Sequence, residues 1–260
     1  MCGMDAIEAF SLNLAYQAGE IMRENFVLGM NKSWKNDNTP LTKSDTAINT
    51  LVINSVKERF PTHAVIGEEE SLKNNSEYVW LCDPIDGTIP FSHGIPTSVF
   101  SLALVHNGIP IFGILYDPFM ERMVTAQKGK GAFLGKTKIT VSTENILKNI
   151  VINVEGATKT KPVHAIRLAL AQKGVRALCL SSIAYSCMLV AAGELAAAVF
   201  MHSSPWDIAA AKVIIEEAGG VCTDLQGKDQ LYDRKVNGFV ASNGLIHKPL
   251  LTLINKYSIK

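Results

Sequence analysis

The chain has 260 residues, of which 47% are hydrophobic and 19% charged, a composition typical of a globular protein with a large core. Its 25 Lys and Arg residues balance 24 Asp and Glu residues, which leaves a net charge of +1 and excludes nucleic-acid binding driven by bulk electrostatics. No apolar stretch reaches the roughly 18 residues that a membrane helix needs.

An amphipathic helix opens the first half of the chain, about 1–140. Apolar residues recur at helical spacing from Ile7 to Phe26, which predicts one long helix with a buried face. The polar stretch 31–40 that follows indicates a surface loop. Its Lys32 and Lys35 are interpreted as solvated charges, and a loop that closes on an anionic ligand is the alternative.

A second helix and a short strand lead to a run of acids. Ser44 or Asp45 is expected to cap the helix, which ends before Pro61. Residues 63–67 are then predicted to form a short strand, and three glutamates, 68–70, follow it directly. Acidic runs are usually solvated. These acids, however, follow a buried strand at a sheet edge, where ligands bind.

Residues 83–88, Asp-Pro-Ile-Asp-Gly-Thr, are the most informative part of the sequence. They follow an apolar run, 78–82, that predicts a buried strand. Pro84 restrains Asp83 to an extended conformation, and Gly87 allows a sharp turn and a close approach to a ligand. The Asp83 and Asp86 carboxylates would repel each other without a cation, and Mg²⁺ suits hard oxygen ligands on a tight backbone. Solvated aspartates at an ordinary turn are the alternative.

Antiparallel strands are predicted after this segment. The runs 98–106 and 109–117 flank Asn107-Gly108, which is the strongest short hairpin signal. Strands at 122–126 and 131–134 continue the pattern, with glycines at 129 and 131 in the turn.

The second half, about 141–260, alternates strands and helices. We expect strands at 151–154, 175–180, 195–200, 220–223 and 238–241, and helices at 163–171, 182–192, 205–218 and 249–257. Pro205 marks the start of the third of these helices, and Gly219-Gly220 marks its end. Asp207 therefore lies in the first turn, where the helix dipole favours a carboxylate; a simple capping acid is the alternative.

The order of these motifs resembles that of the inositol monophosphatase family of Mg²⁺-dependent, typically lithium-sensitive sugar-phosphate phosphatases. The matching segments are residues 68–69, 83–88, 206–210 and 217–220, and the stretches 42–45 and 129–132 match as well, so the resemblance covers essentially the whole chain. It implies one α/β unit over residues 1–260, a layered α-β-α-β-α sandwich of the inositol monophosphatase and fructose-1,6-bisphosphatase type. It also implies a homodimer.

The resemblance implies two to three Mg²⁺ ions per active site. Glu68, Asp83 and the Ile85 carbonyl match the ligands of one ion, and Asp83, Asp86 and Asp207 match those of a second. Glu68 also matches a ligand of a third, weaker ion that holds the attacking water. Metals neutralise phosphate oxygens and lower the pKa of a bound water, so such chemistry requires no covalent side-chain nucleophile.

The remaining site residues are also implied by the resemblance. Asp45 and Thr88 match the pair that helps to activate the water, with Glu68 as the third catalytic residue. Backbone N–H groups at the start of a helix suit an anion, and those of Gly87, Thr88 and Ile89 match the phosphate cradle. The expected substrate contacts are Asp86, Gly87, Thr88, Ile89, Ser181, Ser182, Phe200 and Asp207.

The chain departs from the inositol-specific pattern in two places. After Thr88, residues 89–96 differ from the family's usual Thr-Asn-Phe continuation. Phe200, seven residues before Asp207, stands where those members carry a glutamate that contacts sugar hydroxyls. Phenylalanine cannot accept such a hydrogen bond, so we expect an apolar wall and weaker discrimination. An acceptor within 202–204 is the alternative. His93 and His202 are expected to have structural roles.

The expected function is Mg²⁺-dependent hydrolysis of a small phosphate monoester by direct attack of a metal-bound water. Inositol 1-phosphate is the first substrate hypothesis; histidinol phosphate, fructose 1,6-bisphosphate and 3′-phosphoadenosine 5′-phosphate are substrates of related proteins. A non-catalytic metal-binding or regulatory protein on the same scaffold is the competing hypothesis. Five scattered cysteines without a CxxC pair, and the absence of a signal pattern, indicate a cytoplasmic location.

Overall fold

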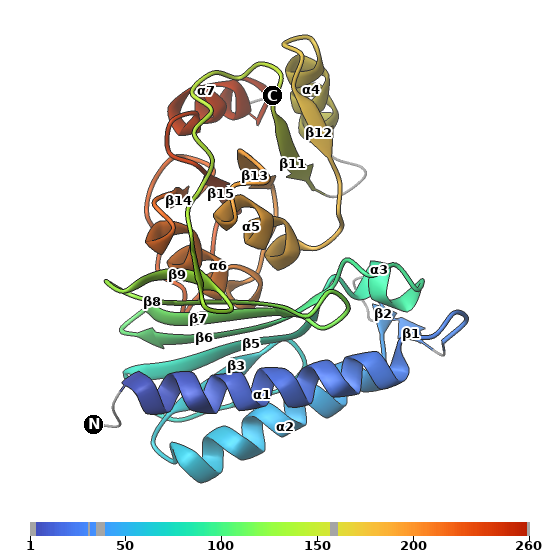
Figure 1. The fold of residues 1–260 in the computed structure, drawn as a ribbon, viewed down its shortest axis with the longest axis vertical. Coiled ribbons are helices and arrows are strands. Elements are labelled where there is room, and N and C mark those ends of the chain that lie inside the picture. Colours follow the sequence, from blue (N-terminus) through green and yellow to red (C-terminus); the bar gives the residue numbers. More distant parts are fainter. Residues whose placement is uncertain (1–3, 31, 35–39, 157–160, 259–260) are drawn as a thin grey trace.

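The computed structural model describes residues 4–30, 32–34, 40–156 and 161–258, which form five layers (Figure 1). Two sheets alternate with three helical layers, so the predicted α-β-α-β-α layering is confirmed. Helices α1 (Met4–Asn25) and α2 (Lys43–Arg59) form the first layer, α5 (Ile183–Ala191) and α6 (Pro205–Glu217) the third, and α4 (Lys161–Ala171) and α7 (His247–Ser258) the fifth.

The first sheet has eight strands in the order β10-β9-β8-β7-β6-β5-β3-β4. Neighbours are antiparallel except β3 and β5, which run parallel. The strands are β3 (Ala64–Gly67), β4 (Ser71–Leu72), β5 (Tyr78–Asp86), β6 (Val99–His106), β7 (Ile109–Asp117), β8 (Arg122–Gln127), β9 (Gly131–Leu134) and β10 (Thr137–Ile139). The hairpin predicted at Asn107-Gly108 is confirmed between β6 and β7.

The second sheet has five strands in the order β12-β11-β13-β15-β14. Strand β11 runs parallel to both of its neighbours, and β15 runs antiparallel to both of its own. The strands are β11 (Val151–Glu155), β12 (Arg176–Leu178), β13 (Ala197–Phe200), β14 (Val221–Thr223) and β15 (Phe239–Ser242).

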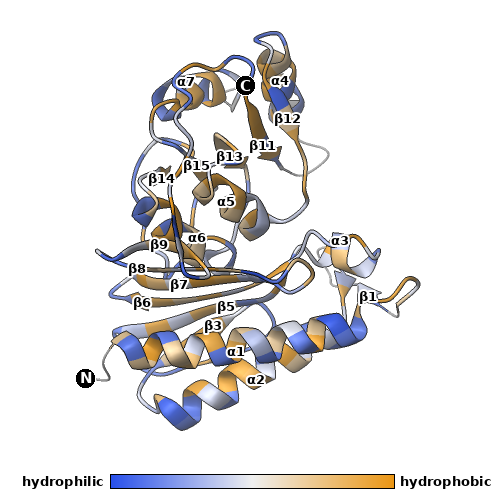
Figure 2. Cartoon of the chain, viewed as in Figure 1, coloured by the Kyte–Doolittle hydropathy of each residue, from blue (hydrophilic) through white to orange (hydrophobic). Residues whose placement is uncertain are grey.

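Burial on both faces of the sheets explains why the strands are almost continuously apolar (Figure 2). Alternate residues of β6 show this: Phe100 and Leu102 pack towards α1 and α2, whereas Val99 and Ala103 pack towards α5 and α6. A third apolar cluster lies between the second sheet and the outer helices α4 and α7.

Two differences from the predicted elements concern β5 and α3. Strand β5 continues through Asp86, beyond the predicted end at residue 82, and a short helix, α3 (Thr88–Ser92), follows it. The pairing of β5 with β6 shifts between Asp83 and Asp86, so Pro84 lies in a bulge where no ladder hydrogen bond is required from it. The bulge directs both aspartates to the end of the sheet.

Two further differences concern the segment around the second helix. The polar stretch contains a small antiparallel pair, β1 (Ser33–Trp34) with β2 (Pro40–Leu41). The N-cap of α2 is Thr42, not Ser44 or Asp45: Thr42 is extended, with φ −109° and ψ 165°, and its N–H donates to Asp45 Oδ2 over 2.8 Å. The reason is a capping box, in which Asp45 occupies the third helical position and reaches back to the cap.

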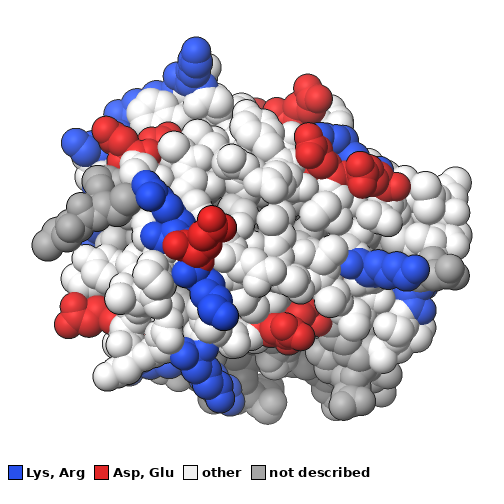
Figure 3. Space-filling view, turned by 90° about the horizontal axis from the view of Figure 1, so that it is seen from below, with Lys and Arg blue, Asp and Glu red and all other residues white. Residues whose placement is uncertain are grey.

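The outer face of α1 and α2 is a mixed surface. Figure 3 shows that, among the described residues, basic and acidic side chains are interspersed on this face and separated by neutral residues. Within the described ranges, no helix combines the length and the apolar character required to cross a bilayer.

Candidate active site

Three carboxylates converge beyond the end of β5. One oxygen each from Asp83, Asp86 and Asp207 lies within 4.8 Å of the others. Asp83 and Asp86 are almost fully buried, at 3% and 4% exposure. The first two come from the bulged end of β5 and the third from the first turn of α6, so the cluster joins the two halves of the chain.

Local hydrogen bonds orient each carboxylate. Asp83 Oδ1 accepts from the N–H of Ile85 over 3.0 Å, which closes the bulge. The Ser182 hydroxyl donates to Asp86 Oδ1, and Ser182 is also the N-cap of α5. Asp207 Oδ2 accepts from the N–H of Ser204 over 2.6 Å, the reach-back contact of a second capping box. Asp207 is therefore both the predicted capping acid and a member of the cluster.

The cluster has the electrostatics of a cation site. The pKa of Asp86 is raised to about 7, mainly by burial and also by the charges of Glu155 and Glu68. Hydrogen bonds from Ser182 and the Ala184 N–H oppose this rise. Burial also raises the pKa of Asp83, and the neighbouring carboxylates add to the effect. None of the described residues that line this cavity is Lys, Arg or His. Hard oxygens without a countercharge fit a divalent cation.

The cavity beside the cluster has a volume of about 190 Å³. It brings together most of the residues predicted for the site, namely Glu68, Asp83, Ile85, Asp86, Gly87, Thr88, Ile89, Ser181, Ser182 and Asp207. Asp45 and Phe200 are not among the described residues that line it.

Gly87 shapes the cavity wall between the cluster and α3. Its φ is +90°, in the left-handed region, and a Cβ there would lie 2.8 Å from Ser182 Cβ and 2.9 Å from the Thr97 carbonyl oxygen. Only glycine fits this position without strain. The turn leads into α3, whose first N–H groups have no partner within the helix. The Thr88 hydroxyl donates to the Ile85 carbonyl over 3.1 Å.

Asp45 does not line the cavity, but it lies close enough to Glu68 for the two charges to interact. It is fully buried, and its Oδ2 accepts from the N–H and the hydroxyl of Thr42. Its Oδ1 has no hydrogen-bond partner among the described residues, and the Thr88 hydroxyl is bonded to the Ile85 carbonyl instead. Burial raises the pKa of Asp45 to about 6; the Thr42 hydrogen bonds lower it and the charges of Glu68 and Glu69 raise it.

This raised pKa predicts a pH dependence of stability. The folded protein holds a proton on Asp45 up to about pH 6, whereas the unfolded chain releases it near 3.8. Ionised Asp45 therefore destabilises the fold, and this cost develops as the pH rises from 4 to 7. In excess chelator, the unfolding free energy of the wild type should fall by about 2.4 kcal/mol relative to Asp45→Asn over that range. Urea titrations of both proteins at several pH values measure this; parallel pH profiles would contradict it.

Phe200 does not form the expected apolar wall. It is 1% exposed and belongs to the core cluster that also holds Ala184 and Ile208. On the neighbouring strand β11, Glu155 pairs in register with Phe200, and it is Glu155 that lines the cavity. Glu155 was not among the residues predicted for the site. It nevertheless carries the same signal as Glu68, an acid at the end of a buried strand, here after residues 151–154.

Because Phe200 is buried, Phe200→Glu should destabilise the protein rather than create a hydroxyl acceptor. An uncompensated charge in the core should lower the unfolding free energy by about 3–5 kcal/mol, measured by denaturant unfolding. Phe200→Leu, which remains apolar, is the matched control and should cost about 1–2 kcal/mol. A Phe200→Glu protein with wild-type stability would show that this side chain reaches solvent.

The remaining candidates lie away from the cavity or outside the described residues. His93 Nδ1 lies 2.8 Å from the Ile89 carbonyl oxygen, and His202 is exposed; neither lines the cavity. Lys32 Nζ donates to the Ser92 carbonyl over 3.2 Å. Lys35 lies outside the described residues.

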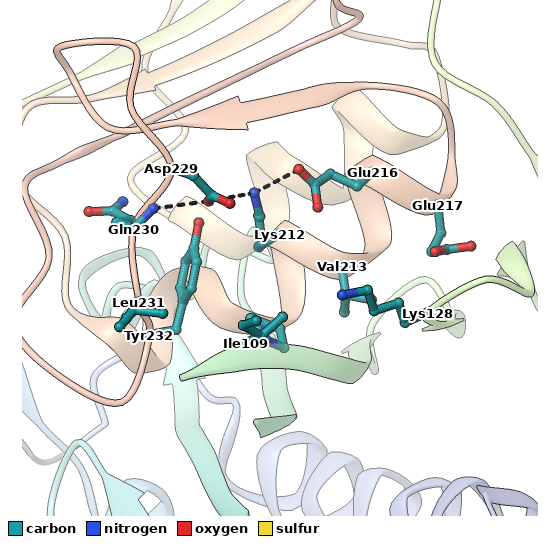
Figure 4. Close-up of a pocket in the computed structure, with 11 residues that line it drawn as sticks. Ile109, Lys128, Lys212, Val213, Glu216, Glu217, Asp229, Gln230, Leu231 and Tyr232 are labelled. Atoms are coloured by element: carbon teal, nitrogen blue, oxygen red, sulfur yellow. Dashed lines mark hydrogen bonds and ion pairs between the residues drawn. The ribbon is translucent and has the colours of Figure 1, made fainter. Parts of the chain in front are cut away.

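A separate pocket of about 390 Å³ surrounds the nearly buried Lys212 (Figure 4). Its ammonium group donates to Glu216 and Asp229 over 2.6 and 2.9 Å, and to the Cys222 carbonyl over 3.4 Å. These partners use all three of its protons. The pocket shares no lining residue with the carboxylate cavity.

The layered fold and the carboxylate cluster, two of whose members are buried, fit a metal-dependent phosphatase. The model of the inositol monophosphatase family matches residues 4–258. The chain belongs to the inositol monophosphatase family. Inositol monophosphatase 1 of Bos taurus is 36% identical over 232 residues, which span 84% of this chain and 83% of that protein.

Two matches from Thermotoga maritima agree with this assignment. A protein named fructose-1,6-bisphosphatase/inositol-1-monophosphatase is 32% identical over 216 residues, which span 83% of this chain and 82% of that protein. The solved structure of an IMPase has a TM-score of 0.90 at 29% identity and covers 97% of this chain and 98% of that chain. The protein is therefore a phosphoric monoester hydrolase, as the sequence predicted.

Proposed function

We propose that the protein hydrolyses a small phosphate monoester with Mg²⁺ and that inositol 1-phosphate is a substrate. The cluster of Asp83, Asp86 and Asp207 carries this proposal, since it is buried, tightly spaced and without a lining cation. The bovine relative bears the name inositol monophosphatase 1, which supports inositol phosphate as the first substrate to examine.

The oxygens available to the metal belong to Asp83, Asp86, Asp207, Glu68 and the Ile85 carbonyl, and we propose two to three Mg²⁺ ions there. Glu68 lines the same cavity, and its charge raises the pKa of Asp83. When bound, Mg²⁺ neutralises phosphate oxygens and makes water a stronger nucleophile at neutral pH. The all-oxygen donor set suits a hard divalent cation such as Mg²⁺.

The chain itself positions the phosphate and holds protons. The first N–H groups of α3, at Thr88 and Ile89, and that of Gly87 lie along the cavity and can donate to phosphate oxygens. The Thr88 hydroxyl and the Glu68 carboxylate face the same space and would orient the attacking water. Asp45, whose pKa is raised, would act with Thr88 as a proton acceptor. Ser181 and Ser182 would contact the substrate from the start of α5.

Fructose 1,6-bisphosphate is the second candidate substrate. The Thermotoga maritima relative whose name includes both activities supports it. Histidinol phosphate and 3′-phosphoadenosine 5′-phosphate stay as further alternatives.

We also propose the properties that accompany this family assignment. These are sensitivity to lithium, a homodimer, a cytoplasmic location and one folding unit built from the halves 1–140 and 141–260. The four described cysteines are free thiols, which is consistent with a reducing compartment. The apolar cluster between the two sheets contains residues of both halves, which supports a single unit.

Turnover of p-nitrophenyl phosphate, inositol 1-phosphate and fructose 1,6-bisphosphate with and without Mg²⁺ tests the proposed function. We expect release of phosphate that requires Mg²⁺ and stops in excess chelator. Equal turnover in chelator would contradict the role of the carboxylate cluster. No turnover of any substrate with Mg²⁺ would favour a non-catalytic protein on this scaffold.

A further inference from the structure

We propose that Glu155 accepts a hydrogen bond from a hydroxyl group of the leaving alcohol and so selects polyol monophosphates over substrates with a second phosphate. This inference rests on the proposed function, because it assigns a specificity-determining residue to the same cavity. It concerns recognition of the alcohol part of the substrate rather than of the phosphate.

Glu155 stands at the end of β11 and lines the cavity together with Ser181 and Ser182. Its strand neighbour in register is Phe200, which is buried in the core. Residues paired across neighbouring strands share one face of a sheet. On this face of the sheet, therefore, β13 contributes Phe200 to the core, and β11 contributes Glu155 to the wall of the cavity.

The carboxylate of Glu155 is held in place by its own surroundings. Its Oε1 accepts from Asn153 Nδ2 over 2.8 Å and from the backbone N–H groups of Leu180 and Ser181 over 3.0 and 2.8 Å. Asn153 is fully buried, and Asn153 Oδ1 also accepts from the Leu180 N–H over 3.1 Å. Ser181 adopts a left-handed conformation, with φ 57°, that points its N–H at the carboxylate.

The second oxygen of the carboxylate is available. Glu155 Oε2 accepts no hydrogen bond from the described residues, and it is not among the buried atoms that lack a partner. Because Oε1 is held by three donors, Oε2 has a defined direction before any ligand binds. A pre-positioned acceptor loses little conformational freedom on binding.

Glu155, like Glu68, differs from the three clustered aspartates of the cavity. It is not one of the three carboxylates whose oxygens lie within 4.8 Å of one another. A charged oxygen outside that cluster is suited to a neutral donor, and hydroxyl groups on the leaving alcohol are such donors. A second phosphate at the same place would be repelled, since like charges at close range disfavour each other.

The test is the ratio of kcat/KM values in Glu155→Gln. The amide oxygen of glutamine can still accept from the Leu180 and Ser181 N–H groups, while the charge at the Oε2 position is removed. Compared with the wild type, kcat/KM for inositol 1-phosphate should fall roughly tenfold or more relative to p-nitrophenyl phosphate, which has no hydroxyl in its leaving group. The kcat/KM ratio of fructose 1,6-bisphosphate to inositol 1-phosphate should rise.

Matched controls separate recognition from structure. Glu194→Gln makes the same change at an exposed position outside the cavity and should leave every ratio unchanged. Glu155→Asp keeps the charge but shortens the side chain by one methylene. It should therefore also lower kcat/KM for inositol 1-phosphate relative to p-nitrophenyl phosphate. It is the second variant if Glu155→Gln does not fold.

Two outcomes would overturn the inference while leaving the proposed function intact. In the first, Glu155→Gln and Glu155→Asp are both active, and their kcat/KM ratios between substrates stay within twofold of the wild-type ratios. In the second, kcat/KM falls equally for all three substrates, which would mean that Glu155 only supports the loop at Leu180. A wild type that releases no phosphate from any of the three with Mg²⁺ would overturn the proposed function and this inference with it.

Discussion

Replacement of Asp86 by asparagine should lower kcat by roughly a thousandfold or more, equivalent to about 4 kcal/mol of transition-state stabilisation. Asp86 is buried beside Asp83 and Asp207, so its charge is part of the cation site rather than of the solvated surface. An amide carries no charge and binds a hard cation weakly. The change should leave the fold intact, because the amide oxygen can still accept the hydrogen bond from Ser182.

A second measurement separates loss of the cation site from loss of structure. Mg²⁺ that binds only the folded state raises the melting temperature, so it should do so for the wild type and much less for Asp86→Asn. In chelator the variant should melt at the same or a higher temperature, since one repelling carboxylate is gone. Asp5→Asn, at an exposed carboxylate of α1, is the control for removal of a charge and should keep wild-type activity. An Asp86→Asn enzyme with more than a tenth of wild-type kcat would contradict the assignment.

Replacement of Thr88 by alanine should lower kcat about a hundredfold while changing KM by no more than a few-fold. Thr88 lines the cavity, with its hydroxyl 3.1 Å from the Ile85 carbonyl oxygen, and in the proposed function this hydroxyl would hold the attacking water. Loss of such a contact weakens the transition state more than the bound substrate. The backbone N–H of residue 88 remains in the variant, so phosphate binding should persist.

Thr88→Ser is the matched variant because it keeps the hydroxyl, and it should retain most of the activity. A Thr88→Ala enzyme in which KM rises and kcat stays unchanged would assign Thr88 to substrate binding alone. A phosphorylated side chain trapped during turnover would contradict direct attack by water. Steady-state kinetics with inositol 1-phosphate and mass spectrometry of the quenched enzyme measure these outcomes.

Much of this protein was determined locally by its sequence. The elements follow from short-range patterns: helical spacing in α1, the Asn-Gly hairpin between β6 and β7, and Pro205 at the start of α6. The segment 83–88 is also local, since Pro84, Gly87 and two aspartates within one turn restrict the backbone to few conformations. The sequence could therefore predict these elements and the closeness of Asp83 to Asp86, whereas the layered fold and the place of Asp207 in the cluster were implied by the resemblance to the family.

The tertiary structure alone decided which side chains share the cavity wall. The register of β11 against β13 places Glu155 at the cavity and Phe200 in the core, and no local pattern determines the register of strands this far apart in the chain. Burial decided the protonation state of the Asp45 carboxyl group, because its raised pKa arises from desolvation by residues distant in sequence. Counting along the chain predicted Phe200 at the site. In the folded structure Phe200 is buried in the core, and Glu155 lines the cavity instead.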